Sequence, residues 1–294
     1  MIRAVSLAAA AVIALLPCGA QAADPATDPS LCAPPPGWTA IIPPLERVAA
    51  RLNHGGPLTI VAVGSSSTSG VGASGPEFTY PSRLETELRA RFPKLDVHVV
   101  NQGKGGEDAP EELARLSRDV VALHPDLAIW QVGTNAVLRR DGLAADGELM
   151  REGIDVMKRS GIDVVLMDLQ YAPRVLDRSA YPAMEDLVAA TAEQAHVGLF
   201  RRFALMRYWQ REHAADAPPM IGADGLHMTD AGYGCLAADL AASLEANWRA
   251  EAKLAQREHG MPDAVAGLPG QVPAERQPAP SPMTPRRNDA TPFN

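Results

Sequence analysis

Short apolar runs alternate with amphipathic segments through the middle of this chain. The runs are rich in Val, Ile and Leu, and each ends in a polar or glycine-rich stretch, which is typical of buried β-strands. They predict five strands, at residues 58–63, 97–100, 127–132, 164–169 and 199–205. Because these runs are apolar throughout, they indicate a mostly parallel sheet that is covered on both faces.

The segments between the strands carry apolar residues at helical spacing. Leu84 and Leu88 define one such face, and Pro93 ends that helix. Asp108, with Glu111 three residues later, is a start signal for the next helix. Helices are predicted at residues 80–92, 110–123, 147–160 and 182–195, and a last long helix follows His227.

Alternating strands and helices predict one α/β domain, a three-layer α/β/α sandwich, over residues 57–256. Ligands bind in such folds outside the carboxyl ends of the strands. Polar clusters follow three of the strands, and a fourth precedes the last helix. The four clusters are residues 64–70 (GSSSTSG), 101–106 (NQGKGG), 133–135 (GTN) and 224–227 (DGLH).

The two ends of the chain differ from this pattern. Residues 1–22 resemble a cleavable signal peptide, with an apolar run and a small-residue site ending at Ala22, which predicts a periplasmic or secreted protein. A lipoprotein anchored at Cys18 is the alternative, although Pro17 does not suit that signal. Residues 23–56 form an N-terminal segment, and the proline-rich residues 257–294 are predicted to be disordered.

Charge and cysteine content limit the possible partners. The formal net charge is −8 and basic residues are not clustered, so neither nucleic acid nor an anionic membrane surface is an expected partner. No stretch approaches the ~20 apolar residues of a membrane span. Cleavage after Ala22 leaves Cys32 and Cys235, which in an oxidising compartment either form a disulfide or remain buried thiols.

The four polar clusters together hold the groups that acyl transfer requires. A serine hydroxyl needs a neutral base within hydrogen-bond reach, and a carboxylate orients that base. Asp224 and His227 lie three residues apart, close enough for the carboxylate to reach the ring. A developing oxyanion needs preplaced donors, which the Gly106 N–H and the Asn135 amide can supply.

In this order and spacing, the clusters resemble the conserved blocks of the SGNH (GDSL-like) hydrolase superfamily. The resemblance covers roughly residues 57–250 and implies a flavodoxin-like fold with about five parallel strands. It implies Ser66 as the nucleophile, His227 as the base and Asp224 as its partner. It also implies an oxyanion hole formed by Ser66, Gly106 and Asn135, and no cofactor or metal ion.

Two residues depart from the family pattern. Ser65 stands where the first block has aspartate, and Ala136 stands where the third block has aspartate. Neither belongs to the implied Ser–His–Asp triad. They raise the question of how the nucleophile turn is held, and Gln131 is a candidate for reaching the site from its strand.

Other interpretations of the same residues are weaker. Residues 70–75 read G-x-G-x-x-G, but they begin well past the strand end, and Pro76 follows them, which does not suit a dinucleotide loop. No histidine pair or CxxC has metal-ligand spacing. Residues 171–183 form a long polar connection, either a solvated loop or a wall for a carbohydrate or acyl acceptor.

The expected function is that of a secreted serine esterase acting on a small-molecule or glycan ester. Because no apolar lid-like segment lies near the motifs, short acyl groups are favoured, and an acetyl group on a glycan is one candidate. Two alternatives remain open: an O-acyltransferase that uses the same site on a glycan acceptor, and a non-catalytic glycan-binding domain.

Overall fold

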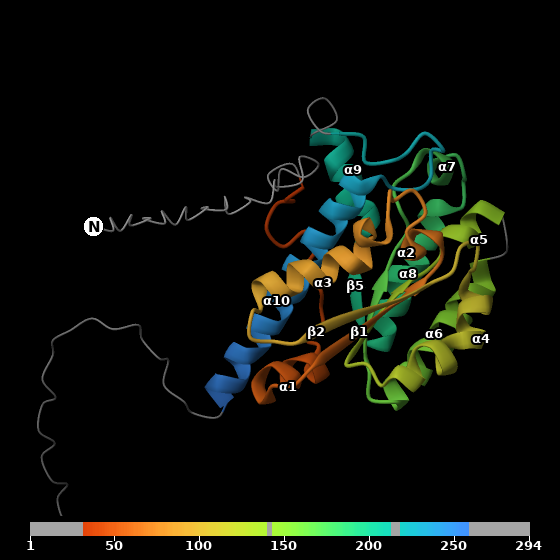
Figure 1. Ribbon diagram of the computed structural model, residues 1–294. Coiled ribbons are helices and arrows are strands. Elements are labelled where there is room, and N and C mark those ends of the chain that lie inside the picture. Colours follow the sequence, from red (N-terminus) through yellow and green to blue (C-terminus); the bar gives the residue numbers. More distant parts are fainter. Residues whose placement is uncertain (1–31, 140–142, 213–217, 259–294) are drawn as a thin grey trace, which may run out of the picture.

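A five-stranded parallel sheet forms the centre of the computed structural model, which describes residues 32–139, 143–212 and 218–258 (Figure 1). The strand order is β2-β1-β3-β4-β5, which is a flavodoxin-like order. The strands are β1 (Leu58–Gly64), β2 (Val97–Gly103), β3 (Leu127–Gln131), β4 (Asp163–Met167) and β5 (Gly198–Phe200). The predicted parallel sheet of about five strands is therefore confirmed.

Helices cover both faces of this sheet and give three layers. One core cluster lies between the sheet and α1, α3, α9 and α10, and a second lies between the sheet and α4, α6 and α8. Figure 1 shows α3 beside α10 on one side and α4 beside α6 on the other. The helices are α1 (Glu46–His54), α2 (Ser66–Ser69), α3 (Tyr80–Arg91), α4 (Ala109–Asp119), α5 (Thr134–Arg139), α6 (Leu143–Arg159), α7 (Pro173–Leu176), α8 (Tyr181–Ala195), α9 (Arg202–Glu212) and α10 (Asp230–Glu258), with 3₁₀ turns at Pro76–Phe78 and Val121–Leu123.

Most of the predicted elements are present, and the fifth strand needs a correction. Asp108 and Glu111 form the expected capping box at the start of α4. The predicted strand at residues 199–205 is wrong beyond Phe200, because α9 begins at Arg202. Phe203 and Leu205 pack from that helix into the core, so the apolar run belongs to two elements.

The N-terminal segment packs on the same core as the rest of the domain. Ile41, Leu45 and Val48 are buried in the cluster beneath α10. Asp163, at the start of β4, accepts the backbone N–H of Val48 over 3.0 Å and so ties α1 to the amino-terminal edge of the sheet. The carboxyl-terminal edge lies at the opposite ends of the strands.

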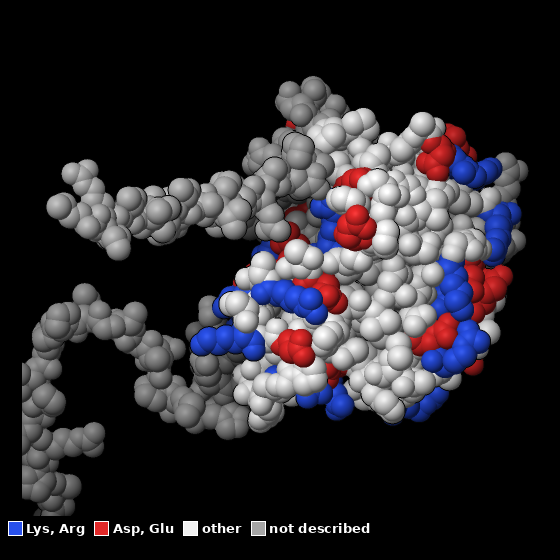
Figure 2. All heavy atoms as spheres, viewed as in Figure 1, with Lys and Arg blue, Asp and Glu red and all other residues white. Residues whose placement is uncertain are grey.

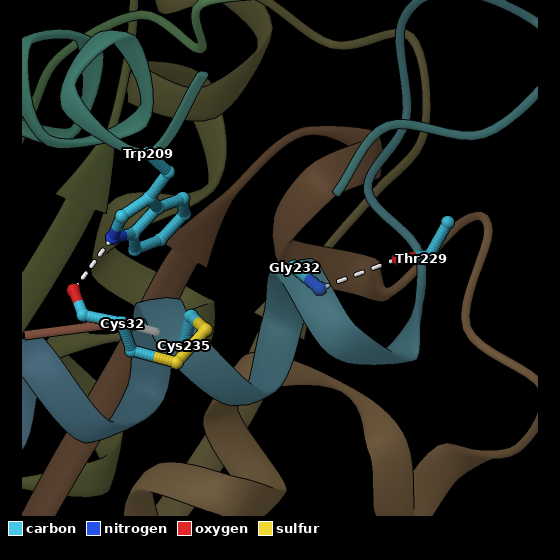
Figure 3. Close-up of a disulfide and its surroundings, with 5 residues drawn as sticks. All are labelled: Cys32, Trp209, Thr229, Gly232 and Cys235. Carbon is cyan, nitrogen blue, oxygen red and sulfur yellow. Dashed lines mark hydrogen bonds between the residues drawn. A yellow bond between two sulfur atoms is a disulfide. The ribbon is translucent and has the colours of Figure 1, made fainter. Parts of the chain in front are cut away.

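A disulfide joins this segment to the last helix, as one of the two sequence interpretations predicted. Cys32 and Cys235 are bonded across 203 residues of sequence. Figure 3 shows the bridge beside Trp209, whose indole N–H donates to the carbonyl oxygen of Cys32 over 2.7 Å. The start of the described chain is thus fixed to α9 and α10 both covalently and by a buried hydrogen bond.

Several predictions concern residues outside the described chain. The signal peptide at residues 1–22 lies there, and so does nearly all of the predicted tail. Helix α10 continues to Glu258, so the boundary predicted after residue 256 falls within its last turn. In the described part of the chain, no helix is both long and apolar enough for a membrane span.

Basic and acidic side chains are interspersed on the face of the molecule shown in Figure 2. Several basic groups of the described chain form ion pairs. Asp119, for example, pairs with Lys104 over 2.9 Å and with Arg115 over 3.2 Å. Charges of both signs therefore lie next to one another on the described surface.

Candidate active site

The predicted nucleophile lies on a tight turn between β1 and α2. Ser66 is the first residue of α2 and is partly exposed, whereas its neighbours Ser65 and Ser67 are buried. Gly64 ends β1 with φ +154°, and a Cβ there would lie 2.6 Å from the Thr68 hydroxyl oxygen. Glycine is therefore required where the chain turns from the strand to the serine.

Ser66, His227 and Asp224 form a continuous hydrogen-bonded chain. The His227 Nε2 atom lies 2.9 Å from the Ser66 Oγ atom, and His227 Nδ1 lies 2.5 Å from Asp224 Oδ2. The serine is contributed by the β1–α2 turn, and the other two residues come from the loop before α10. The structure thus brings together the three residues for which the sequence predicted a shared site.

The loop around Asp224 fixes that carboxylate. Its Oδ1 atom accepts the backbone N–H groups of Leu226 and His227, each over 3.0 Å. Partial burial opposes ionisation, but these N–H groups and the His227 ring outweigh it and hold the pKa of the Asp224 carboxyl at about 2. An ionised carboxylate therefore faces the imidazole ring at neutral pH.

The predicted oxyanion donors lie on the glycine loop after β2 and at the start of α5, which a hydrogen bond joins. Asn135 is in the first turn of α5, and its side-chain Nδ2 atom donates to the Glu107 carbonyl oxygen over 2.6 Å. Gly106 has φ +83°, and its carbonyl oxygen accepts a bond from Arg139. A Cβ added to Gly105 would lie 3.9 Å from the Ser66 Cβ, so this glycine loop approaches Ser66 closely.

A buried arginine anchors the glycine loop to the end of β1. The Arg115 Nε atom lies 2.5 Å from the Glu107 carboxylate, and Arg115 Nη2 donates to the Gly64 carbonyl oxygen over 3.2 Å. The Lys104 N–H donates to the same carbonyl over 2.9 Å. Arg115 was not predicted from the sequence, because its helical position gives no sign of these distant partners.

Two buried glutamines connect the site to strand ends. The Gln131 Oε1 atom accepts hydrogen bonds from the turn around Ser66, as the sequence suggested for this residue. Gln170, just past β4, donates to the Leu226 carbonyl oxygen over 3.1 Å and was not predicted. Gln131 and Gln170 each follow an apolar run in the sequence, and this pattern is the signal that could identify them as residues near the site.

The connection predicted as a loop or substrate wall contains α7 and packs more tightly than expected. Tyr171 contacts the Phe203 ring edge-on at a centroid distance of 5.2 Å, and Tyr181 stacks on the same ring at 5.4 Å. The N–H of Arg174 donates to the Gly225 carbonyl oxygen over 3.0 Å. The two tyrosines therefore pack against the core. The hydrogen bond from Arg174 joins α7 to the loop that carries Asp224.

The two departures from the family pattern are both buried. Ser65 is 3% exposed, and Ala136 is fully buried in α5. No carboxylate takes the place of either aspartate at those positions. Within residues 32–139, 143–212 and 218–258, no group of three or more His, Cys, Asp or Glu side chains could hold a metal ion.

Known proteins resemble this chain in sequence and in fold. Residues 31–249 match the model of the non-GDSL lipase-like family. The chain belongs to that family. The resemblance to SGNH hydrolases inferred from the sequence is confirmed, and the Ser65 substitution agrees with the description of a non-GDSL lipase-like family.

Relatives of this non-GDSL lipase-like chain include known esterases. An arylesterase of Vibrio mimicus is 28% identical over 151 residues, which cover 51% of this chain and 70% of the arylesterase. The structure of Axe2, an acetylxylan esterase from Geobacillus stearothermophilus, has a TM-score of 0.55 at 21% identity over 66% of this chain and 97% of Axe2.

A second solved structure has the same degree of similarity. It is a two-domain esterase that is active on acetylated mannans, with a TM-score of 0.55 and 21% identity over 71% of this chain and 53% of that protein. At these identities the two structures establish the fold. They confirm the three-layer sandwich of the non-GDSL lipase-like chain.

Proposed function

We propose that this protein is a serine esterase that hydrolyses short-chain carboxylic esters through an acyl-enzyme on Ser66. That it is a carboxylester hydrolase follows from its family and from its arylesterase relative. The proposal concerns the mechanism, the residues that carry it out and the substrate.

The first half of the reaction forms the acyl-enzyme. The Ser66 Oγ atom attacks the ester carbonyl carbon while its proton passes to His227 Nε2, which lies 2.9 Å away. Asp224 holds the imidazole through Nδ1 and stabilises the imidazolium. The tetrahedral intermediate collapses when His227 returns that proton to the oxygen of the leaving alcohol, and the acyl group remains on Ser66.

The second half repeats the chemistry with water. His227 takes a proton from a water molecule, and the resulting hydroxide attacks the acyl carbon. The proton then returns to Ser66 Oγ as the carboxylic acid leaves. In both halves the negative oxygen is stabilised by the N–H groups of Ser66 and Gly106 and by the Asn135 amide.

The observation that carries the proposal is the unbroken chain from Asp224 through His227 to Ser66. Its 2.5 Å link joins Asp224 to His227, three positions apart, and its 2.9 Å link joins His227 to Ser66, 161 positions apart in the sequence. An ionised carboxylate is the group expected at the far end of such a chain, and the low pKa of Asp224 supports that state. A binding module would have no need for this arrangement.

The proposed substrates are esters of short acyl groups, with an acetyl group on a glycan as one candidate. The sequence has no apolar lid-like segment near the four motifs, which favours a small acyl group over a long-chain lipid. Two proteins of the same fold act on acetylated xylan and mannan, and a third relative is an arylesterase. The disulfide supports action in an oxidising compartment such as the periplasm or the extracellular space.

The experiment measures turnover of p-nitrophenyl acetate by the wild type and by Ser66→Ala. We expect Ser66→Ala to lose at least about 10⁴-fold in kcat. Ser65→Ala and Ser67→Ala are matched controls that remove neighbouring hydroxyls, and both are expected to lose far less. A wild type inactive on every short ester, or an active Ser66→Ala variant, would contradict the proposal.

Hydrolysis and acyl transfer share this site and are separated by their products. The same assay is run with an added xylooligosaccharide acceptor, and the products are identified by mass spectrometry. We expect free acetate as the main product with and without the acceptor. Acetylated oligosaccharide as the main product would identify the protein as an O-acyltransferase instead.

A further inference from the structure

The Gln131 side chain makes an unusual set of contacts beside the predicted nucleophile. Its Oε1 atom lies 3.0 Å from the Ser65 backbone nitrogen, 2.9 Å from the Ser65 hydroxyl and 3.0 Å from the Ser67 hydroxyl. The Thr68 hydroxyl lies 3.3 Å from the same atom. Gln131 is 1% exposed, so these donors meet one acceptor in a buried environment.

The contacts flank Ser66 on both sides. Ser65 precedes it and Ser67 follows it, and Gln131 comes from the end of β3, the strand beside β1. An amide oxygen has only two lone pairs, so the 3.3 Å contact from Thr68 is the weakest of the four. Thr68 also lies 3.3 Å from the Tyr80 hydroxyl, which gives it a second partner.

A buried arginine fixes the direction of the hydrogen bonds. The Arg202 Nη1 atom donates to the Ser67 Oγ atom over 2.9 Å, and a guanidinium group can only donate. The Ser67 hydroxyl therefore directs its own proton at Gln131 Oε1. Arg202 is fully buried, and its Nε and Nη2 atoms donate to the Asp168 carbonyl oxygen over 3.0 and 2.6 Å.

Two buried carboxyl groups lie near Arg202. Asp168 and Glu185 are hydrogen-bonded to each other, and burial raises the pKa of both carboxyl groups. Two buried carboxyl groups in contact cannot both ionise readily, because each negative charge disfavours the other. The two hydrogen bonds to the Asp168 carbonyl oxygen hold the guanidinium group behind Ser67.

We propose that Gln131 is a positioning residue that holds the turn carrying Ser66 in its reactive geometry. The proposal rests on the function proposed above, in which Ser66 is the nucleophile. Gln131 does not touch the substrate; it acts through Ser65 and Ser67. Ser65 stands where the Gly-Asp-Ser block of the family has aspartate. In this chain, Gln131 would hold the turn through its hydrogen bonds to Ser65 and Ser67.

We expect Gln131 to affect the position of the Ser66 side chain more than the free energy of unfolding of the protein. A nucleophile displaced by ~1 Å can lose about 10²-fold in rate, because the attack distance and the bond to the base both change. Removal of the acceptor at Gln131 would leave four buried donors on the turn without their shared acceptor. Because unsatisfied buried donors are costly, the turn is expected to rotate so that they form other hydrogen bonds.

The test compares Gln131→Met with Gln131→Glu. Methionine has similar length but no strong acceptor, whereas glutamate retains an oxygen at the Oε1 position. We expect Gln131→Met to lower kcat on p-nitrophenyl acetate by about 10²-fold with little change in KM. We expect Gln131→Glu to keep kcat within about tenfold of the wild type, because the acceptor is restored.

A second readout follows the nucleophile itself. The rate of covalent inactivation by a fluorophosphonate ester is expected to fall in parallel with kcat in Gln131→Met. Val48→Ala is the control for destabilisation, because it opens a cavity at the opposite edge of the sheet and lowers Tm without touching the site. Its kcat and its inactivation rate should match those of the wild type.

Ser67→Ala tests the same claim with a smaller change, in case Gln131→Met does not fold. It removes the link between Arg202 and Gln131, and we expect kcat to fall by about tenfold. Wild-type kcat in both the folded Gln131→Met and the Ser67→Ala variants would overturn the positioning role. So would equal losses in Gln131→Met and Gln131→Glu when both are folded.

Failure of this proposal is distinguishable from failure of the proposed function. Ser66→Ala is assayed in the same series. If Ser66→Ala is inactive and Gln131→Met retains wild-type kcat, only the positioning role is wrong. If Ser66→Ala keeps wild-type turnover, Ser66 is not the nucleophile, and both proposals are overturned.

Discussion

The Asn135 side-chain amide donates to the carbonyl oxygen of Glu107 over 2.6 Å. This bond fixes the orientation of the amide, and we propose that its second hydrogen donates to the oxyanion. Because that donation matters most in the transition state, Asn135→Ala should lower kcat by about 10²–10³-fold with little change in KM. Steady-state kinetics on p-nitrophenyl acetate measure both constants.

Asn135→Asp serves as the matched variant for that prediction. It keeps the size of the side chain but replaces the amide donor by a negatively charged carboxylate. We expect a kcat at least as low as that of Asn135→Ala. A fully active Asn135→Asp enzyme would show that the side chain at position 135 does not stabilise negative charge in the reaction.

Asp224→Asn tests the role of the carboxylate within its loop. The asparagine oxygen can still accept the N–H groups of Leu226 and His227, so the loop should keep its shape. Its amide would favour the wrong tautomer of His227 and leave the imidazolium unsupported, so kcat should fall by up to about 10⁴-fold. Turnover at neutral pH, with circular dichroism to verify the fold, gives the result.

The bond between Cys32 and Cys235 closes a very long loop and should contribute strongly to stability. Replacement of both cysteines by serine is expected to reduce the free energy of unfolding by about 2–5 kcal/mol. The active-site residues lie elsewhere, so kcat below the unfolding transition should not change. Urea unfolding of the oxidised wild type and the double variant measures the difference; equal midpoints would contradict it.

Glu112 gives the stability a specific dependence on pH. It accepts the Trp130 indole N–H over 2.7 Å, and burial raises the pKa of its carboxyl group from 4.5 to about 8. Between these values the folded protein holds a proton that the unfolded chain releases. The stability from Glu112 is therefore fully present below about pH 4.5, and it is lost as the pH rises toward 8.

Glu112→Gln isolates this effect, because glutamine can accept the same bond and does not ionise. We expect the variant to gain stability relative to the wild type by roughly 1 kcal/mol per pH unit at most between pH 5 and 8. Unfolding free energies measured at several pH values give the difference curve. A flat curve would show that Glu112 ionises without cost in the folded state.

The fold was largely predictable because the strands are buried on both faces. Runs such as residues 127–132 are apolar throughout and have glycine or polar residues at their ends. The run at residues 199–205 was ambiguous, because a short apolar stretch fits a strand and a buried helix equally well. The break after Phe200 depends on Arg202, whose partners lie on other elements.

The candidate site was predictable where its groups are close in sequence or follow strand ends. The three-residue spacing of Asp224 and His227 is one case, and the turn at Ser66 after β1 is another. The supporting contacts of Arg115, Gln170 and Arg202 were not predictable, because each depends on tertiary packing between distant segments. Gln131 was singled out only by being polar at the end of an apolar strand.

The claim that Ser66 is the nucleophile is tested most directly by locating the covalent adduct. The wild type is treated with a fluorophosphonate ester until turnover stops, and its peptides are then sequenced by mass spectrometry. We predict one adduct per molecule, on Ser66, and none in Ser66→Ala. An adduct on Ser65, Ser67 or Ser69 in the inactivated wild type, with Ser66 unmodified, would contradict the account.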